Sequence, residues 1–262
     1  KVIQTVSDFD KMVKKIYKKK EVAIDTETSS LNINIAKLVG ISFSFNEKEA
    51  YYLPLDHKND DEFENLDFKN IFTILKKLLE DTSIIKIGHN IKYDKIILLK
   101  KNINLNPVED TMLLSYVLDG GKIKHNLDDL AKLYFDHDNI KYKEVVGVGK
   151  KEKTFNEISI KDAYIYASED SDITYRLYIL LKKRIIEEKL FNIYESIEKP
   201  LINVIVNIER NGIKIDTKEL KKLSSIFLEK IISIEKQVFK YSKFDFNIAS
   251  PKQLGEVLFE KM

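Results

Sequence analysis

Residues 22–28, VAIDTET, place two carboxylates directly after a short apolar run. Successive side chains of a β-strand point to opposite faces, so Asp25 and Glu27 are predicted to share one face. Two like charges this close repel each other unless a cation or a proton lies between them. Carboxylate oxygens at a strand end suit a hard divalent metal ion. For this stretch alone, a solvated strand end is an equally good interpretation.

Outward from this strand, the hydrophobic pattern predicts alternating strands and helices. Strands are expected at 22–25, 41–45, 50–55 and 84–88. Helices are expected from the N-cap Ser7 to about Lys20, over 68–80 and 92–101, over 111–118 with Asp110 as N-cap, and from the N-cap Ser159 to about Lys189. Residues 41–45, ISFSF, alternate apolar and serine, which predicts a strand with one buried face. This order indicates an α/β fold with a mixed sheet.

A second polar motif, HNIKYD at residues 89–94, follows the strand at 84–88. The strand end delivers Asn90, and Asp94 lies one helical turn further on the same side. Open α/β sheets place their binding sites at such strand ends. Read alone, Asp94 is also an ordinary first-turn acid that stabilises the helix dipole.

A third motif, YASEDSD at residues 166–172, lies within the long final helix of the α/β part. Tyr166 and Asp170 are four residues apart and therefore share a face. That face continues through Thr174, Leu177 and Leu181 and is mostly apolar, so Asp170 needs a partner or a metal ion there. Glu169 and Asp172 fall off this face and are predicted to be solvated.

Composition narrows the classes of protein. The 262 residues carry a net charge of only +2, and no cysteine is present, which excludes disulfides and thiolate metal sites and fits a reducing intracellular compartment. No apolar run approaches the roughly 20 residues of a membrane span, so no membrane partner is expected. The N-terminus begins inside a helical pattern, so no targeting peptide is expected within this chain.

The order D-x-E, N-x-x-x-D and Y-x-x-x-D resembles the DEDD exonuclease superfamily, in the variant with a tyrosine. Residues 110–116, DTMLLSY, and 127–131, LDDLA, are similar to the proofreading domain of family A DNA polymerases, the bacterial polymerase I type. The resemblance implies a ribonuclease H-like fold, with a mixed β-sheet flanked by helices, followed by an α-helical segment. It also implies a metal-dependent 3′–5′ exonuclease that removes mispaired 3′-terminal nucleotides from DNA.

The helical tail extends the resemblance over nearly the whole chain. Residues 208–216, IERNGIKID, resemble the signature that opens the family's polymerase domain, and residues 246–254, FNIASPKQL, resemble its thumb motif. We therefore expect an exonuclease domain at 1–192 and a truncated thumb base at 193–262, with the remaining polymerase domain as partner. The lysine, asparagine and isoleucine bias resembles plastid (apicoplast) polymerases of malaria parasites, which implies a plastid location.

The family resemblance implies two-metal phosphodiester hydrolysis that releases nucleoside monophosphates. The expected cofactors are two divalent ions, Mg²⁺ or Mn²⁺. Their expected ligands are Asp25, which bridges both ions, with Glu27 and Asp170 on the first and Asp94 on the second. Tyr166 is expected to orient the attacking water with help from Glu27, because a free phenol has a pKa near 10.

The same resemblance implies a binding site for a single-stranded or frayed 3′ end of DNA. Leu31 would wedge against the terminal base, Tyr142 would stack on it, and Asn90 and the Thr26 backbone would hold the terminal nucleotide. Ordinary packing is the alternative role for Leu31 and Tyr142.

Two other functions stay open at this point. One is an RNA-trimming exonuclease of the same superfamily, which would share the acids but not the segments at 210–212 and 250–253. The other is a non-catalytic scaffold that supports a polymerase, which predicts missing carboxylates, and none is missing here.

Overall fold

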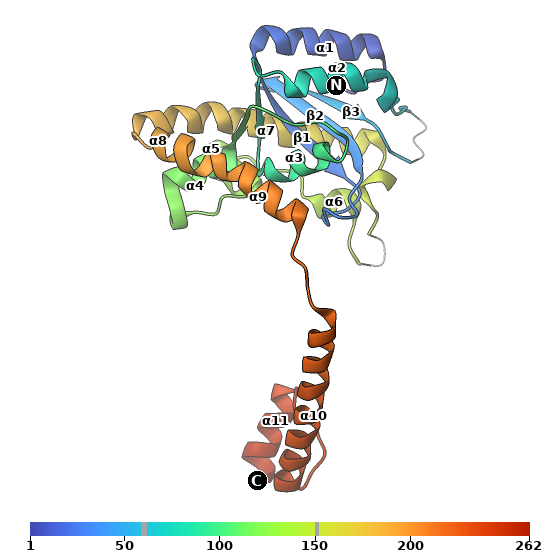
Figure 1. Cartoon of the computed structure of the whole chain (residues 1–262), viewed down its shortest axis with the longest axis vertical. Helices are drawn as coiled ribbons and strands as arrows, with labels where there is room; N and C mark the ends of the chain where they lie inside the picture. Colours follow the sequence, from blue (N-terminus) through green and yellow to red (C-terminus); the bar gives the residue numbers. More distant parts are fainter. Residues whose placement is uncertain (59–61, 150–151) are drawn as a thin grey trace. The chain divides into compact units, whose positions relative to one another are not determined.

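A mixed sheet forms the centre of residues 1–211 in this computed structural model, which describes residues 1–58, 62–149 and 152–262 (Figure 1). Its strands are β1 (Glu21–Thr28), β2 (Leu38–Asn46), β3 (Glu49–Pro54), β4 (Ile85–Gly88) and β5 (Val108–Asp110). The order across the sheet is β3-β2-β1-β4-β5. β1 pairs antiparallel with β2 and parallel with β4, which confirms the predicted mixed α/β sheet.

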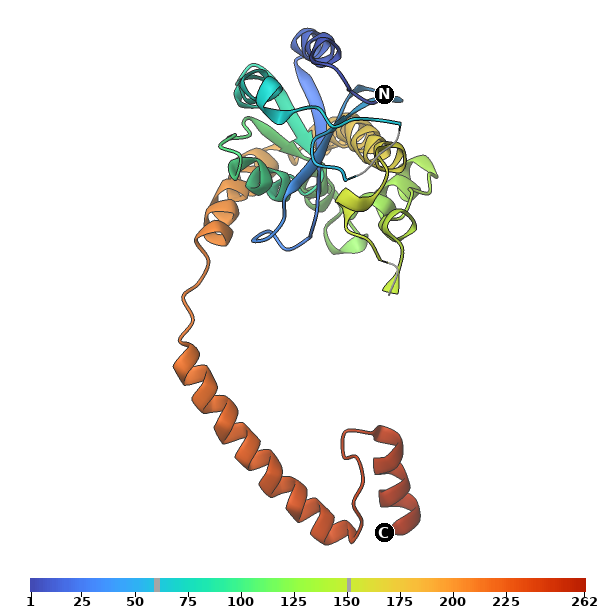
Figure 2. The ribbon, with the colours of Figure 1, turned by 90° about the vertical axis from the view of Figure 1, so that its right-hand side faces the viewer.

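Helices cover both faces of this sheet (Figure 2). The longer ones are α1 (Val6–Lys19), α2 (Phe68–Glu80), α3 (Lys92–Leu99), α4 (Thr111–Asp119), α5 (Leu127–Phe135), α7 (Ile160–Glu187) and α9 (Lys199–Asn211). Short helical segments are η1 (Gly120–Lys122), α6 (Tyr142–Val146), η3 (Phe155–Glu157), α8 (Phe191–Ile193) and η4 (Tyr194–Glu198). One core joins α1, α2 and α3 to Ile24 of β1, and a second joins α4, α5 and α7 to Ala23. Neighbouring residues of β1 thus enter different cores. Because side chains alternate along a strand, Asp25 and Glu27 point to the same face of the sheet as Ala23.

Several helix ends match their sequence signals, and one does not. α2 has the predicted bounds, and Ser159 caps α7 by accepting a hydrogen bond from Asp162 N at 3.1 Å. The predicted N-cap Ser7 is wrong, because Thr5 caps α1 and accepts from Asp8 N at 3.1 Å. Thr5 has the extended backbone of an N-cap, so the helix begins two residues before the predicted start.

β2 is buried on both faces, whereas its alternating pattern predicted one buried face. Ser42 and Ser44 are as inaccessible as Phe43 between them. The reason is that α7 packs across the serine side of the strand, where small side chains let the helix approach.

The compact unit extends through α9 to Asn211, beyond the predicted domain boundary at 192. Ile202 and Val206 of α9 are buried in the core that contains α3, so this helix packs with the sheet domain. The assignment of 1–192 to exonuclease and 193–262 to polymerase stays a prediction about function rather than packing.

Residues 212–262 form a second unit with α10 (Thr217–Ser242), α11 (Pro251–Glu256) and the π-helical turn η5 (Val257–Lys261). Ser250 caps α11 with Pro251 in the first turn, as the start signal predicted. Gln253 Oε1 accepts from Asn247 N at 2.8 Å and not from the N-cap residue, so the capping box is incomplete. Across the described ranges, we find no helix with both the length and the apolar character needed to cross a membrane.

Candidate active site

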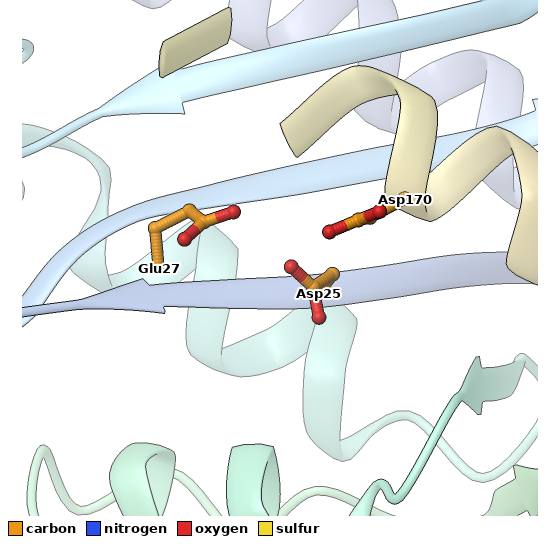
Figure 3. A group of neighbouring side chains, drawn as sticks. All are labelled: Asp25, Glu27 and Asp170. Atoms are coloured by element: carbon orange, nitrogen blue, oxygen red, sulfur yellow. The ribbon is translucent and has the colours of Figure 1, made fainter. Parts of the chain in front are cut away.

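Three carboxylates from two distant segments converge at the centre of the sheet (Figure 3). Asp25 and Glu27 leave the same face of β1, and Asp170 faces them from α7. One oxygen of each carboxylate lies within 4.8 Å of the others. β1 can deliver two acids here because the preceding residues, Val22 to Ile24, are fully buried and anchor the strand.

α7 places Tyr166 and Asp170 on one stripe, as their four-residue spacing predicted. Below them, Thr174, Leu177 and Leu181 are all buried, which fixes the rotation of the helix. Burial and the charge of Asp170 raise the pKa of the Tyr166 phenol, so the phenol interacts with the acid cluster.

Asp94, the fourth predicted acid, lies in the first turn of α3 and bonds to β1. Its Oδ1 accepts from Thr26 N at 2.9 Å and from Thr26 Oγ1 at 2.6 Å. Asp94 therefore stands outside the group of three converging oxygens and keeps its second oxygen for another partner. The Thr26 N–H is committed to Asp94, so a nucleotide contact by Thr26 stays a prediction.

All the predicted site residues line one cavity of about 240 Å³. It is lined by Asp25, Thr26, Glu27, Thr28, Leu31, His89, Asn90, Tyr93, Asp94, Tyr142, Tyr166 and Asp170. The nine residues singled out from the sequence are all in this lining. Their individual roles in binding and catalysis stay predictions.

Thr28, His89 and Tyr93 also line the cavity and were not predicted from the sequence. Tyr93 shares a 2.6 Å hydrogen bond with the Thr28 hydroxyl and donates to Ser30 O at 2.9 Å. His89 Nδ1 lies 2.8 Å from Thr111 Oγ1. All three flank a predicted residue in sequence, which was the only signal available for them.

Burial and mutual repulsion hold protons on this cluster. Burial raises the pKa of Asp25 to about 6, although a hydrogen bond with Glu27 lowers it. Burial, followed by the charge of Asp25, raises the pKa values of Glu27, Asp94 and Asp170 well above the ordinary carboxyl range. With no cation bound, full ionisation of these carboxyl groups is energetically unfavourable. Bound cations offset the repulsion and stabilise the ionised cluster.

A protein-family model described as "3′-5′ exonuclease" matches residues 1–186, which include the three converging carboxylates. The chain belongs to this 3′–5′ exonuclease family. Its fold and enzyme class are therefore those predicted from the carboxylate motifs.

Named relatives of this exonuclease are DNA polymerases. DNA polymerase I of Pseudomonas aeruginosa is 38% identical over 265 residues, covering 100% of this chain and 29% of the relative. DNA polymerase I of Borreliella burgdorferi is 39% identical over 267 residues, covering 99% of this chain and 28% of the relative. The chain thus spans less than a third of the length of these relatives.

Solved structures share the fold at low sequence identity. The POL domain of Pol1 from M. smegmatis, in complex with DNA primer-template and dNTP, has a TM-score of 0.72 at 18% identity. That match covers 96% of this exonuclease chain and 40% of the solved chain. Brucella melitensis NrnC with bound Mg²⁺ has a TM-score of 0.57 at 22% identity. That match covers 75% of this chain and 88% of the solved chain.

The donor set of the exonuclease fits the divalent metal ions that its family implies. All candidate ligands are carboxylate oxygens, the donors that hard cations prefer. Glu27 Oε1 is buried and has no hydrogen-bond partner among the described residues, so it is available as a ligand. Asp25, Glu27 and Asp170 could hold one ion, and Asp94 lies in the same cavity.

Leu31 and Tyr142 border the cavity in different ways. Leu31 is 81% exposed, far more than packing would leave it, which argues against the ordinary packing role. Tyr142 is 36% exposed, stacks on Phe155 with ring centroids 6.3 Å apart, and meets Tyr166 edge-on at 6.2 Å. Tyr142 therefore has both a packing role and an accessible ring.

The prediction that Glu169 and Asp172 are solvated is wrong. Glu169 accepts from Ile140 N at 2.7 Å and pairs with His137 Nε2 at 2.8 Å. Asp172 accepts a hydrogen bond from Lys48 N and lies 3.7 Å from Arg176. These acids leave the catalytic stripe but meet loops that pack beside α7, which the helical periodicity alone does not show.

Proposed function

We propose that this exonuclease removes mispaired nucleotides from the 3′ end of DNA as the proofreading part of a longer family A DNA polymerase. The observation that supports this most directly is the convergence of Asp25, Glu27 and Asp170 within 4.8 Å, in a cavity also lined by Leu31 and Tyr142. An acid cluster alone could serve other chemistry. An exposed aliphatic and an accessible aromatic ring beside it favour an unstacked nucleotide base as the ligand.

The proposed cofactors are two Mg²⁺ or Mn²⁺ ions. Asp25, Glu27 and Asp170 would hold the first, and Asp94, together with Asp25, would support the second. When bound, such ions supply a hydroxide-like nucleophile at neutral pH and neutralise charge on the phosphate.

The protein side chains would orient the reactants around this centre. Burial and the charge of Asp170 raise the pKa of Tyr166, so its hydroxyl stays protonated at neutral pH and can hold the attacking water by a hydrogen bond. A phenol in this state orients water and does not act as a base. Leu31, Tyr142 and Asn90 would hold the terminal nucleotide.

Selection of mismatches then follows from access to the cavity. A paired 3′ end must melt before its last base can reach Tyr142, and each step of DNA stacking costs about 1–2 kcal/mol. A mismatched end has already lost much of this stability. Discrimination would come from fraying, with no reading of base edges.

The test uses single-stranded DNA oligonucleotides labelled at either end. With Mg²⁺ or Mn²⁺, we expect a descending ladder from the 5′-labelled strand and immediate release of labelled mononucleotide from the 3′-labelled strand. Neither should form in EDTA. Shortening from the 5′ end would contradict the proposal.

A matched RNA oligonucleotide addresses the alternative function. Faster cleavage of RNA than of DNA would favour the RNA-trimming exonuclease and overturn the proofreading role. No cleavage of either strand with either metal would favour the non-catalytic scaffold.

We also propose, from the lysine, asparagine and isoleucine bias, that the parent protein is a plastid (apicoplast) polymerase of a malaria parasite. Antibodies against residues 1–211 should then label the plastid of parasite cells together with a plastid marker. Labelling confined to the nucleus would contradict this location.

A further inference from the structure

Asp110 connects the ends of two neighbouring strands through its carboxylate. It is the last residue of β5 and is buried. Its Oδ1 accepts from Met112 N at 2.9 Å and Leu113 N at 3.3 Å, which caps α4. The same carboxylate also reaches across to the β4–α3 connection, where Oδ1 accepts from Asn90 N at 3.2 Å and Oδ2 from Ile91 N at 2.9 Å.

The β4–α3 connection depends on these bonds because it has no side-chain cap of its own. Ile91, the residue at the N-cap position of α3, makes no side-chain capping hydrogen bond. Asn90 has a positive φ of 60°, an uncommon backbone conformation that needs support from its surroundings. A buried N–H without an acceptor is costly, so the Asp110 carboxylate supplies what the local sequence lacks.

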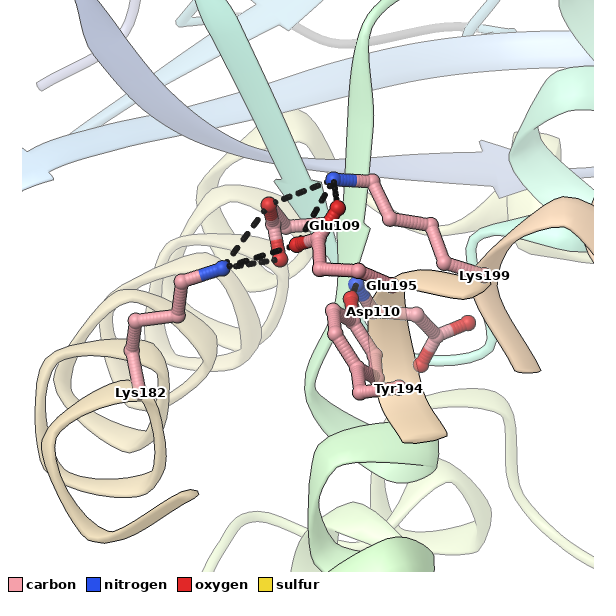
Figure 4. Close-up of polar contacts among 6 residues, drawn as sticks. All are labelled: Glu109, Asp110, Lys182, Tyr194, Glu195 and Lys199. Atoms are coloured by element: carbon pink, nitrogen blue, oxygen red, sulfur yellow. Dashed lines mark hydrogen bonds and ion pairs between the residues drawn. The ribbon is translucent and has the colours of Figure 1, made fainter. Parts of the chain in front are cut away.

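The main chain around Asp110 is itself anchored from another direction (Figure 4). Asp110 N donates to the hydroxyl of Tyr194, a fully buried side chain, at 2.9 Å. The adjacent Glu109 is held by Lys182 of α7 at 3.1 Å and by Lys199 of α9 at 2.8 Å. β5 therefore presents the Asp110 carboxylate from a fixed position.

We propose that Asp110 is a positioning residue of the nuclease, which holds Asn90 and, through the start of α3, Asp94 in the catalytic cavity. The inference rests on the proposed function for its kinetic consequences. Asp110 does not line the cavity and does not touch the expected substrate. It acts through the two backbone N–H groups that it orients.

A simpler explanation is that Asp110 only caps α4. A variant that keeps this cap but loses the bonds to the β4–α3 connection separates the two roles. Asp110→Ser does so, because serine caps helices as well as aspartate but its shorter side chain does not reach Asn90 and Ile91. Asp67→Ser is the matched control, since Asp67 caps α2 by accepting from Lys69 N at 2.9 Å. If Asp110→Ser fails to fold, Asp110→Asn replaces it and disturbs chiefly the bond to Ile91.

The first readout does not depend on nuclease activity. Amide hydrogen exchange of Asn90 and Ile91 should become about tenfold faster in Asp110→Ser, while Met112 and Leu113 keep their protection. Asp67→Ser should leave all four amides unchanged. Unchanged exchange at Asn90 and Ile91 in Asp110→Ser would overturn the proposal, whether or not the wild type cleaves DNA.

The second readout tests the functional step. Asp110→Ser should lower kcat/KM on single-stranded DNA about 10- to 100-fold, the range for residues that orient metal ligands, whereas Asp67→Ser stays within about twofold. In an Asn90→Ala background, the KM part of the Asp110→Ser effect should shrink, because both changes act on one unit. If the effects of Asp110→Ser and Asn90→Ala were fully additive, or if Asp110→Ser lost stability but kept normal kinetics, Asp110 would be only a helix cap. An inactive wild type would instead contradict the proposed function.

Discussion

Two donors of Thr26 meet a single oxygen of Asp94, the main-chain N–H at 2.9 Å and the hydroxyl at 2.6 Å. The bonds lock the first turn of α3 to the central strand across 68 residues of sequence. They also explain why Asp94 is in the cavity but outside the group of three converging carboxylates. One oxygen of Asp94 is used for structure, and the other remains for a metal ion or its water.

Thr26→Val tests this arrangement, because valine keeps the β-branched shape and the N–H but removes the hydroxyl. A hydrogen bond to a charged group contributes about 1.5–3 kcal/mol, so cleavage at limiting metal should fall by roughly tenfold or more. The metal concentration for half-maximal cleavage should rise. Thr73→Val, on the exposed side of α2, is the control. An unchanged metal requirement in Thr26→Val would show that the hydroxyl does not support Asp94.

Asp25→Ala should abolish nuclease activity and leave the fold intact. Asp25 is the expected shared ligand, and a loss of ~10³-fold corresponds to about 4 kcal/mol of transition-state stabilisation. Because one member of a repelling cluster is removed, the metal-free variant should melt at the same temperature as the wild type or above it. Asp10→Ala on α1 controls for loss of an acid. Retention of more than about a tenth of wild-type cleavage would contradict the assignment.

Tyr142→Ala should weaken binding of single-stranded DNA by about 1–3 kcal/mol if the base stacks on this ring. Tyr142→Phe keeps the π-face and should bind nearly as well as the wild type. Because Tyr142 also packs on Phe155 and Tyr166, metal binding is measured in parallel by calorimetry. Equal DNA affinity of the alanine and phenylalanine variants would remove the stacking role.

Substrates with single-stranded, mismatched and paired 3′ ends should be degraded in that order of decreasing rate. The physical reason is the stacking free energy that a paired end must lose, about 1–2 kcal/mol per step. The measurement compares initial rates on three duplexes that differ only in the terminal pairs. Equal rates on all three would falsify the fraying account.

The acid cluster predicts how stability depends on pH. Unfolded aspartate titrates near 4, and burial raises the folded pKa of Asp25 to about 6 and the pKa of Glu27 well above its ordinary range. The folded state therefore binds more protons than the unfolded state in this range, so metal-free stability is greatest below pH 4 for these groups and falls as pH rises through 6.

Melting temperatures in EDTA and in Mn²⁺ between pH 5 and 8 measure this linkage. The stabilisation by Mn²⁺ should grow with pH, because metal binding must displace the retained protons. Asp170→Asn should show a shallower pH dependence than the wild type. If Mn²⁺ raised the melting temperature by the same amount at pH 5.5 and at pH 8, the cluster would not retain these protons.

Sequence patterns predicted four of the five strands, most helices and the three acid motifs, because each depends on residues within a few positions of one another. α2 and the Ser159 cap are examples. The short strand β5 (Val108–Asp110) was missed. The packing of α9 against the sheet domain was not predicted, because the burial of Ile202 and Val206 depends on a core formed by distant strands and helices.

Within the site, the spacing in the motifs found the carboxylates but not their partners. The bond between Tyr93 and Thr28 joins residues 65 apart, and the Thr111 contact of His89 spans 22. Glu169 was expected in solvent because it lies off the buried stripe of the helix, and its partner His137 is 32 residues away in sequence. Contacts of this kind arise from tertiary structure, which local propensity does not encode.

The packing of α9 defines what a transplantable nuclease module would contain. A fragment ending near residue 187, where the α7 helix stops, would lack Tyr194, Lys199 and Ile202, and would expose the surfaces that they cover. Glu109 would then keep only Lys182 as a cation among the partners described here. A chimera that grafts this nuclease onto another polymerase should therefore be joined after Asn211, in the stretch before α10, where the fusion cuts through no buried side chain of the donor.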